Sequence, residues 1–225
     1  MAMIHLEPQT LEMFSRALDG LKPPPNLSLS QWADKYRKLS AEASASQGQW
    51  NTDAAPFQRE IMDAIGDVHI RKVVAMMCAQ AGKTEGLILN TIGFYMDYHP
   101  ASIMVMQPTV NLGESFSKDR LTPMLRDTPA LRGLVNTKSR YSGNTISKKN
   151  FPGGMLVIVG ANAPTDLRSR PIKVLLADEV DAYKASAGKE GDPVMLAEER
   201  QTTFWDYKTV MVSTPTTKAA SRILD

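Results

Sequence analysis

The sequence has little of what marks secreted or membrane-spanning proteins. It contains one cysteine, Cys78, so no disulfide can form within the chain, and this fits a reducing compartment. It lacks an apolar run long enough to span a bilayer, and its N-terminus lacks the basic and apolar segments of a signal peptide. We therefore expect a soluble, intracellular protein.

Net charge is also small, at +2, and favours no class of partner. Its distribution is uneven. Residues 115–150 hold eight Lys or Arg and two acids, whereas residues 177–206 hold eight acids and three bases. The basic stretch, from Lys118 to Lys149, is either an electrostatic footprint for a phosphate backbone or a solvated surface.

A chain of 225 residues can form one α/β domain with a small appendage. We expect an N-terminal appendage and linker over 1–55, because three prolines in the stretch 21–28 forbid a helix there. A short helix should follow the linker, with Ser30 as a candidate N-cap. The main domain should cover 56–225.

Strand-like and helical segments alternate along that domain. Because the strands are continuously apolar, the pattern predicts an α/β fold with a mostly parallel sheet covered on both faces. Pro123 should kink or split one helix. The expected strands are 72–78, 101–108, 172–178 and 207–215, with a hairpin of 144–150 and 154–160 closed over 151–153; the expected helices are 56–67, 82–99, 109–127 and about 193–203.

The junction of the first strand and its helix resembles a phosphate-binding P-loop. It ends in Gly82, Lys83 and Thr84, but Met77 stands where the opening glycine is expected. A strand-to-helix turn aims backbone N–H groups at an anion, Lys83 would reach the β- and γ-phosphates, and Thr84 would ligate Mg²⁺. Gly-Lys-Thr also occurs at ordinary turns. The stretch expected to contact ATP is Gln80, Ala81, Gly82, Lys83, Thr84 and Glu85.

Two carboxylates follow a second buried strand. Asp178 is placed to hold Mg²⁺, as in a Walker B motif, and Glu179 to deprotonate the attacking water. Adjacent carboxylates at a strand end are unfavourable unless a cation neutralises them. Asp181 is a third carboxylate, an N-cap or a surface residue.

Two further elements fit the same site. Ser213 and Thr214, followed by Pro215, end a buried strand and could hydrogen-bond the γ-phosphate or the carboxylates; the alternative is a simple strand stop. Gln58 offers the donor and acceptor that the N6/N7 edge of adenine requires, although a Gln at a helix start often has no such role.

Together these elements resemble the large subunit of tailed-phage terminases, the DNA-packaging motors, and most closely the lambda-type branch. The resemblance is carried by the variant loop, by "ADE" and "STP", and by "WADKY", "GQW" and "PFQRE" between residues 30 and 62. It covers roughly 30–217 and implies a RecA-like ATPase core using ATP and Mg²⁺. Gln58 then matches the adenine-reading glutamine, and Ser213, Thr214 and Pro215 match the coupling motif.

The resemblance also implies partners. Terminases drive double-stranded DNA into a procapsid as a ring, thought to be a pentamer, docked on the portal protein, while a small terminase subunit selects the DNA. We therefore expect a location in the host cytoplasm, transiently on the procapsid. Terminase large subunits also carry a nuclease domain, for which no acidic cluster follows residue 225, so the chain resembles the isolated ATPase half.

One departure concerns the arginine that many terminases carry in the loop, where this chain has Ala79. An arginine finger is worth about 10³–10⁵ in rate, so we expect one from elsewhere, for example from a neighbouring subunit. Arg168 and Arg170 are the candidates, and Arg120 is a weaker one; each could instead be a surface charge or a DNA contact.

Two other functions stay open. A superfamily-two helicase fragment has the same order of motifs but needs a second RecA-like domain, which 225 residues cannot hold. A degenerate, non-hydrolysing assembly module would explain Met77 and Ala79, but it would have no need of Glu179.

Overall fold

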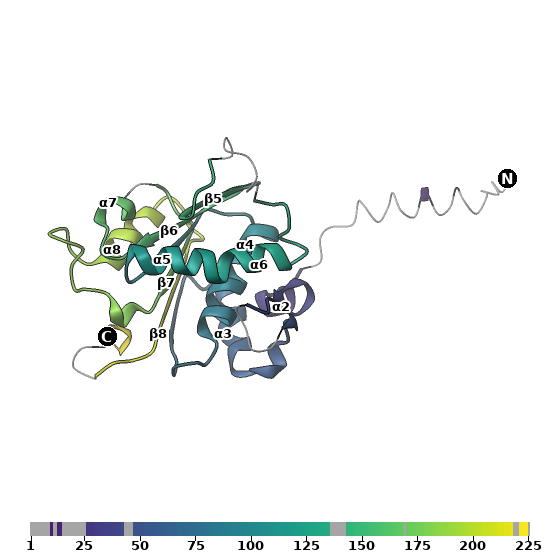
Figure 1. Ribbon diagram of the computed structural model, residues 1–225, viewed down its shortest axis with the longest axis horizontal. Coiled ribbons are helices and arrows are strands. Elements are labelled where there is room, and N and C mark those ends of the chain that lie inside the picture. Colours follow the sequence, from purple (N-terminus) through teal and green to yellow (C-terminus); the bar gives the residue numbers. More distant parts are fainter. Residues whose placement is uncertain are drawn as a thin grey trace.

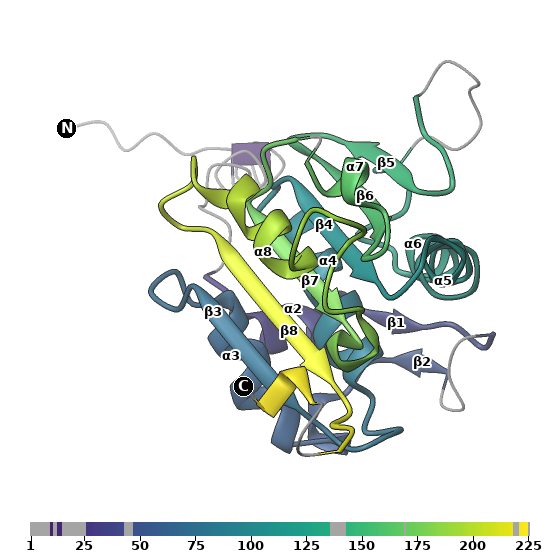
Figure 2. The same cartoon turned by 90° about the vertical axis from the view of Figure 1, so that its left-hand side faces the viewer.

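The computed structural model describes residues 10, 13–14, 26–42, 47–135, 143–168, 170–217 and 221–224. One sheet runs through the centre of the fold (Figure 1). Its six strands lie in the order β3-β8-β7-β4-β6-β5, in which every pair is parallel except β5 with β6 (Figure 2). The expected α/β class with a mostly parallel sheet is confirmed. The strands are β3 (Lys72–Met76), β4 (Ile103–Gln107), β5 (Lys148–Phe151), β6 (Gly154–Gly160), β7 (Val174–Asp178) and β8 (Lys208–Ser213).

The sheet separates two apolar clusters, because alternate residues of a strand point to opposite faces. In β4, Ile103 and Val105 belong to one cluster and Met104 and Met106 to the other. Helices α3 (Phe57–Gly66) and α4 (Asn90–Asp97) cover the first face, and α7 (Pro164–Leu167) and α8 (Pro193–Glu198) the second (Figure 2). Burial on both faces explains why β4 and β7 are almost continuously apolar. The expectation of a buried strand at 72–78 is wrong, because β3 is an edge strand in which Val74 and Met76 are about half exposed.

The helices expected over 82–99 and 109–127 each contain a π-helical segment. The segment η2 (Thr84–Leu89) leads into α4, and η3 (Ser117–Leu121) joins α5 (Val110–Phe116) to α6 (Thr122–Asp127). The Thr122 N–H bonds to the Ser117 carbonyl, five residues back, directly before Pro123. The helix expected over 109–127 thus does not break at Pro123 but widens into a π-helical turn directly before it, and this wide turn accommodates a residue without an N–H.

The hairpin turn is shorter than expected. Phe151 pairs with Gly154, which leaves Pro152 and Gly153 as a two-residue turn. Gly153 has φ 82°, a conformation that glycine adopts without a steric penalty. The remaining elements are α2 (Leu29–Tyr36), β1 (Lys38–Leu39), β2 (Gly48–Gln49), η1 (Thr52–Ala54), η4 (Val180–Ala182), η5 (Glu199–Gln201) and η6 (Arg222–Leu224).

Helix α2 packs into the main core. Trp32 is fully buried, its ring lies edge-on to Phe94, and its Nε1–H donates to Asp97 Oδ2 at 2.8 Å. The domain boundary at residue 55 stays a prediction, although this helix shares the cluster of α3 and α4. Most of the proline linker lies outside the described residues. Within the described part of the chain, no helix has the length and hydropathy to cross a bilayer.

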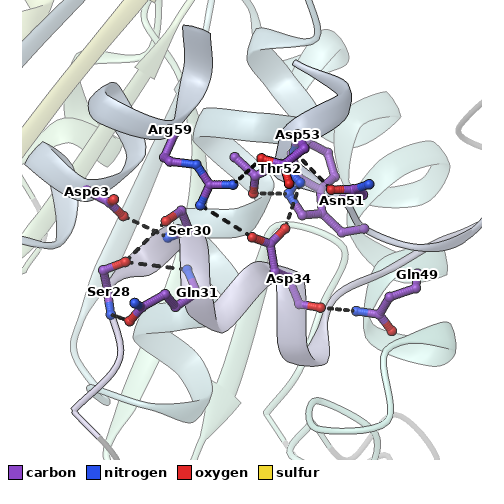
Figure 3. Close-up of polar contacts among 11 residues, drawn as sticks. Ser28, Ser30, Gln31, Asp34, Gln49, Asn51, Thr52, Asp53, Arg59 and Asp63 are labelled. Carbon is purple, nitrogen blue, oxygen red and sulfur yellow. Dashed lines mark hydrogen bonds and ion pairs between the residues drawn. The ribbon is translucent and has the colours of Figure 1, made fainter. Parts of the chain in front are cut away.

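The prediction of Ser30 as the N-cap of α2 is wrong. Ser28 caps the helix in a capping box, in which Gln31 bonds back to the Ser28 N–H at 3.0 Å. The Ser30 N–H instead donates to Asp63 Oδ1 on α3 at 3.1 Å (Figure 3). Ser followed by Gln three residues later is the capping-box signature, so the sequence did contain the right signal.

Candidate active site

The carboxyl ends of β3, β7 and β8 meet at one edge of the sheet and bring the three predicted motifs together. Parallel strands place their ends on the same side, which is where ligands bind in open α/β sheets. The loop after β3 runs beside the end of β8, where the Met77 N–H donates to the Ser213 carbonyl at 3.0 Å.

The loop turns without an opening glycine. Met77 still pairs like a strand residue and is 8% exposed, so its position requires no glycine. The turn is made by Gln80, at φ 59°, and Gly82, at φ 74°. A left-handed non-glycine residue costs of order 1–3 kcal/mol, and such residues gather at functional sites. The described residues contain two of them, Gln80 and Glu179, and both lie at this edge.

Lys83 lies at the centre of the site and is 7% exposed. Its Nζ donates to Thr214 Oγ1 at 2.9 Å and forms an ion pair with Glu179 Oε1 at 2.9 Å. One ammonium therefore joins the P-loop, the end of β7 and the end of β8.

Asp178 is the buried carboxylate of the site, at 3% exposed. Its Oδ2 accepts hydrogen bonds from Thr84 Oγ1 at 3.4 Å and Gln107 Nε2 at 3.1 Å. Its Oδ1 is buried and has no partner among the described residues. Burial raises the pKa of Asp178, and the hydrogen bond from Gln107 works against that rise.

These residues fit Mg²⁺. An unpartnered buried carboxylate oxygen beside a threonine hydroxyl suits a cation that keeps most of its waters and takes one or two protein ligands. No group of three His, Cys, Asp or Glu able to hold a metal occurs in the described ranges, so Thr84 and Asp178 are the candidate ligands. Gln107 was missed by the sequence analysis, although it ends a buried strand as Asp178 does.

Glu179 leaves the strand direction at once, with φ 55° and ψ 50°. This turn brings its side chain to Lys83, and its Oε2 lies 3.5 Å from the Thr214 N–H. The side chain is 41% exposed. A carboxylate that is accessible to water and adjacent to the phosphate-binding lysine has the position of a general base.

The two hydroxyls of the Ser-Thr-Pro stretch face different ways. Thr214 contacts Lys83 and Glu179, whereas Ser213 is fully buried and its Oγ accepts from the Asp181 N–H at 3.1 Å. The Asp181 carboxylate accepts the N–H groups of Thr216 and Ile223, each at 2.8 Å. Asp181 therefore caps the segment after β8 and does not join the site carboxylates.

Gln58 and Glu85 connect the loop and its helix to other elements of the fold. Gln58 is 1% exposed, and its Nε2 donates to the Ala81 carbonyl at 2.6 Å. Glu85, in the helix that follows the loop, pairs with Arg37 at 2.8 Å and Arg120 at 3.4 Å. Burial raises the pKa of Glu85, and the two arginines oppose that rise. The sequence analysis missed Arg37, which follows α2 directly and is buried against Glu85.

Among the described residues, Arg168 and Arg170, the main candidates for the arginine finger, have their contacts away from Asp178 and Glu179. Arg168 pairs with Glu190 at 3.0 Å, and the Arg170 guanidinium lies 3.4 Å from the Met155 sulfur, near the start of β6 and thus toward the opposite edge of the sheet. Arg120 contacts the P-loop helix through Glu85. The identity of the finger stays a prediction.

The comparisons with known proteins agree with this geometry. The model of the family "Phage terminase large subunit gpA, ATPase domain" matches residues 44–225. The large terminase subunit of Enterobacteria phage P21 is 30% identical over 203 residues, which are 89% of this chain and 31% of that protein. That of Escherichia phage lambda is 29% identical over 217 residues, 95% of this chain and 33% of that protein. The chain thus spans about a third of the length of these relatives.

Solved structures share the fold. The HK97 large terminase matches with a TM-score of 0.66 at 16% identity, over 86% of this chain and 38% of that one. The ATPase domain of the Thermus phage P74-26 large terminase matches with a TM-score of 0.51 at 18% identity, over 71% of this chain and 64% of that one. These domains have a RecA-like fold, as expected here. The chain belongs to the family of ATPase domains of phage terminase large subunits.

Proposed function

We propose that this chain hydrolyses ATP and that hydrolysis drives double-stranded DNA into a procapsid. The observation that supports this most is the meeting of Lys83, Thr84, Asp178 and Glu179 at the carboxyl edge of a parallel sheet. Family membership favours this function over a helicase fragment. The protein would act in the host cytoplasm, in a ring docked on the portal, with a small subunit delivering the DNA.

The ion pair of Lys83 with Glu179 suggests how the site responds to ATP. Lys83 would exchange its contact with Glu179 for oxygens of the β- and γ-phosphates. Glu179 would then be released to orient a water molecule and accept its proton. Held by Thr84 and Asp178, Mg²⁺ would supply neutralisation of the phosphate charge.

Thr214 is the residue we propose for coupling. It contacts Lys83 through its hydroxyl and Glu179 through its backbone N–H. Both partners of the ion pair are therefore hydrogen-bonded to the residue that follows β8. Loss of the γ-phosphate would change both contacts together. This supports the coupling role that the resemblance gives to the Ser213–Pro215 stretch.

The test is Mg²⁺-dependent ATP hydrolysis by the chain and by Glu179→Ala, across a wide range of protein concentration. Glu198→Ala, which removes a carboxylate that pairs with Lys72 at the start of β3, away from the site, is the matched control. We expect turnover that needs Glu179 and rises more than linearly with concentration, because a neighbouring subunit supplies the arginine. Turnover linear in concentration would place the finger in the same chain. ATP binding without any turnover would favour the assembly module.

For DNA, the described part of the basic stretch narrows the candidates. Lys149 is buried and donates to the carbonyls of Thr145 and Ile146, so it is unsuited to a phosphate contact. Lys118 and Lys148 are more accessible, whereas Lys138 and Arg140 lie outside the described residues. We expect weak binding of duplex DNA that falls steeply with salt and weakens in Lys148→Gln. Binding that ignores salt would refute this contact.

A further inference from the structure

Gln58 is joined to the P-loop by a direct hydrogen bond between distant parts of the chain. The residue is the second of α3, is 1% exposed, and donates through Nε2 to the Ala81 carbonyl at 2.6 Å. Its Oε1 is buried and has no hydrogen-bond partner among the described residues. The amide therefore contacts the loop from α3, and because it is buried it is not accessible to an adenine base.

Two glycines make room for this amide. A Cβ on Gly86 would lie 1.8 Å from Gln58 Oε1 and 2.7 Å from its Cδ, and a Cβ on Gly82 would lie 3.0 Å from Nε2. Gly86 is in the interior of a helical segment, where glycine is less favourable than alanine. The close approach of Gln58 gives a physical reason for the glycine at this position.

The bond also fixes the orientation of a peptide in the loop. A trans peptide is planar, and its C=O and N–H point in opposite directions. With the Ala81 carbonyl held by Gln58, the Gly82 N–H is directed to the other side, away from α3. A phosphate oxygen can accept a hydrogen bond there, as in other P-loops.

We propose that Gln58 is a positioning residue, which holds the Ala81–Gly82 peptide in its phosphate-binding orientation, with Gly86 providing the space. This rests on the proposed function, since it concerns the same ATP site. It differs from the adenine-reading role that the sequence suggested for Gln58. A positioning residue affects every phosphate ligand alike, whereas a base reader affects adenine nucleotides alone.

The first experiment is calorimetric titration of the chain with ADP, GDP and inorganic pyrophosphate in the presence of Mg²⁺. We expect Gln58→Ala to weaken all three by a similar factor, about two- to tenfold, as for the loss of one hydrogen bond. Gln49→Ala is the matched control, because its exposed amide also donates to a backbone carbonyl, that of Asp34 at 2.8 Å. A loss confined to ADP would overturn the proposal.

The second experiment pairs Gln58→Ala with Gly86→Ala. Gly86→Ala should displace the Gln58 amide and weaken pyrophosphate binding as Gln58→Ala does, and the double variant should bind no more weakly than either. If the loss of pyrophosphate affinity in the double variant equalled the product of the two single losses, the two residues would not act through one contact and the proposal would be refuted.

Thermal unfolding without ligand tests the same contact separately. Gly86→Ala should lower Tm when Gln58 is present, because the new methyl group collides with its amide. The same substitution should raise Tm when it is added to the Gln58→Ala variant, because the collision is then gone and alanine favours the helix. If wild type bound no phosphate ligand, the proposed function would fail, while equal Tm changes in both backgrounds would sink this inference.

Discussion

Replacing Glu179 by Gln should change ATP binding and ATP hydrolysis in opposite directions. In the proposed mechanism Lys83 exchanges its contact with Glu179 for phosphate oxygens, so ATP binding competes with this ion pair. Because the Glu179 side chain is 41% exposed, solvent screens the pair and limits it to about 0.2–1 kcal/mol. Removing the charge should therefore tighten ATP binding by up to about fivefold.

Hydrolysis should fall by far more than binding rises. Loss of a positioned general base costs typically about 10²–10⁴ in rate. Binding would be measured by titrating a fluorescent ATP analogue with Mg²⁺, and turnover by phosphate release under single-turnover conditions. Glu198→Gln is the control, since its carboxylate pairs with Lys72 at 2.9 Å, the length of the Lys83–Glu179 pair, at the start of β3 and away from the site; it should change neither quantity.

Weaker ATP binding by Glu179→Gln would refute this reasoning. It would mean that Glu179 supports the bound state, for example by ordering Thr214, with which it shares a contact of 3.5 Å. Unchanged turnover would refute the role of Glu179 as general base, because another group would then accept the proton.

Three other predictions concern the surroundings of the site. Gln107→Leu should raise the Mg²⁺ concentration needed for half-maximal ATP binding, because Asp178 loses the donor that orients its carboxylate; an unchanged requirement would refute that role. Trp32→Ala should lower the free energy of unfolding by about 3–5 kcal/mol in urea, and a loss under about 1 kcal/mol would mean that α2 is not part of the core. Burial lowers the pKa of His99, with Lys173 adding to the effect, so the unfolded chain takes up the proton first as pH falls. Stability should therefore drop below about pH 6.5, by at most about 1.4 kcal/mol per pH unit for this group, and His99→Gln should remove that part of the drop in urea titrations at several pH values.

The sequence was sufficient for the order of the elements and for the residues at strand ends. Continuous apolar runs located the parallel strands, although one of them, β3, is an edge strand and not a buried one. A polar residue directly after a buried run, as at Asp178, must lie at the carboxyl edge. The same rule places Gln107 at this edge, but we did not apply it there because no known motif includes that residue. The π-helical segments could be anticipated at Pro123, where a backbone donor is missing, but not at Thr84–Leu89, where no residue requires one.

Contacts between distant segments were beyond the sequence. Arg37 looked like an ordinary charged residue near the end of a short helix, yet it is fully buried against Glu85, 48 positions later. Gln58 was chosen for its chemistry, but its orientation depends on Gly82 and Gly86, and nothing in the sequence links it to them. Composition and periodicity assign a residue to an element; they do not say which element its side chain meets.

The missing P-loop glycine shows how such contacts can replace a motif residue. A glycine serves where the backbone must turn with positive φ or pass close to a neighbour. At Met77 neither condition holds, because the chain is still paired to Ser213 and the side chain fills part of the core. The turn is displaced to Gln80, whose strained backbone must be held by its surroundings. The bond from Gln58 to Ala81, one residue further on, provides such a restraint. A loop that departs from the P-loop pattern can thus keep its function because α3 supplies from outside what the pattern normally encodes within it.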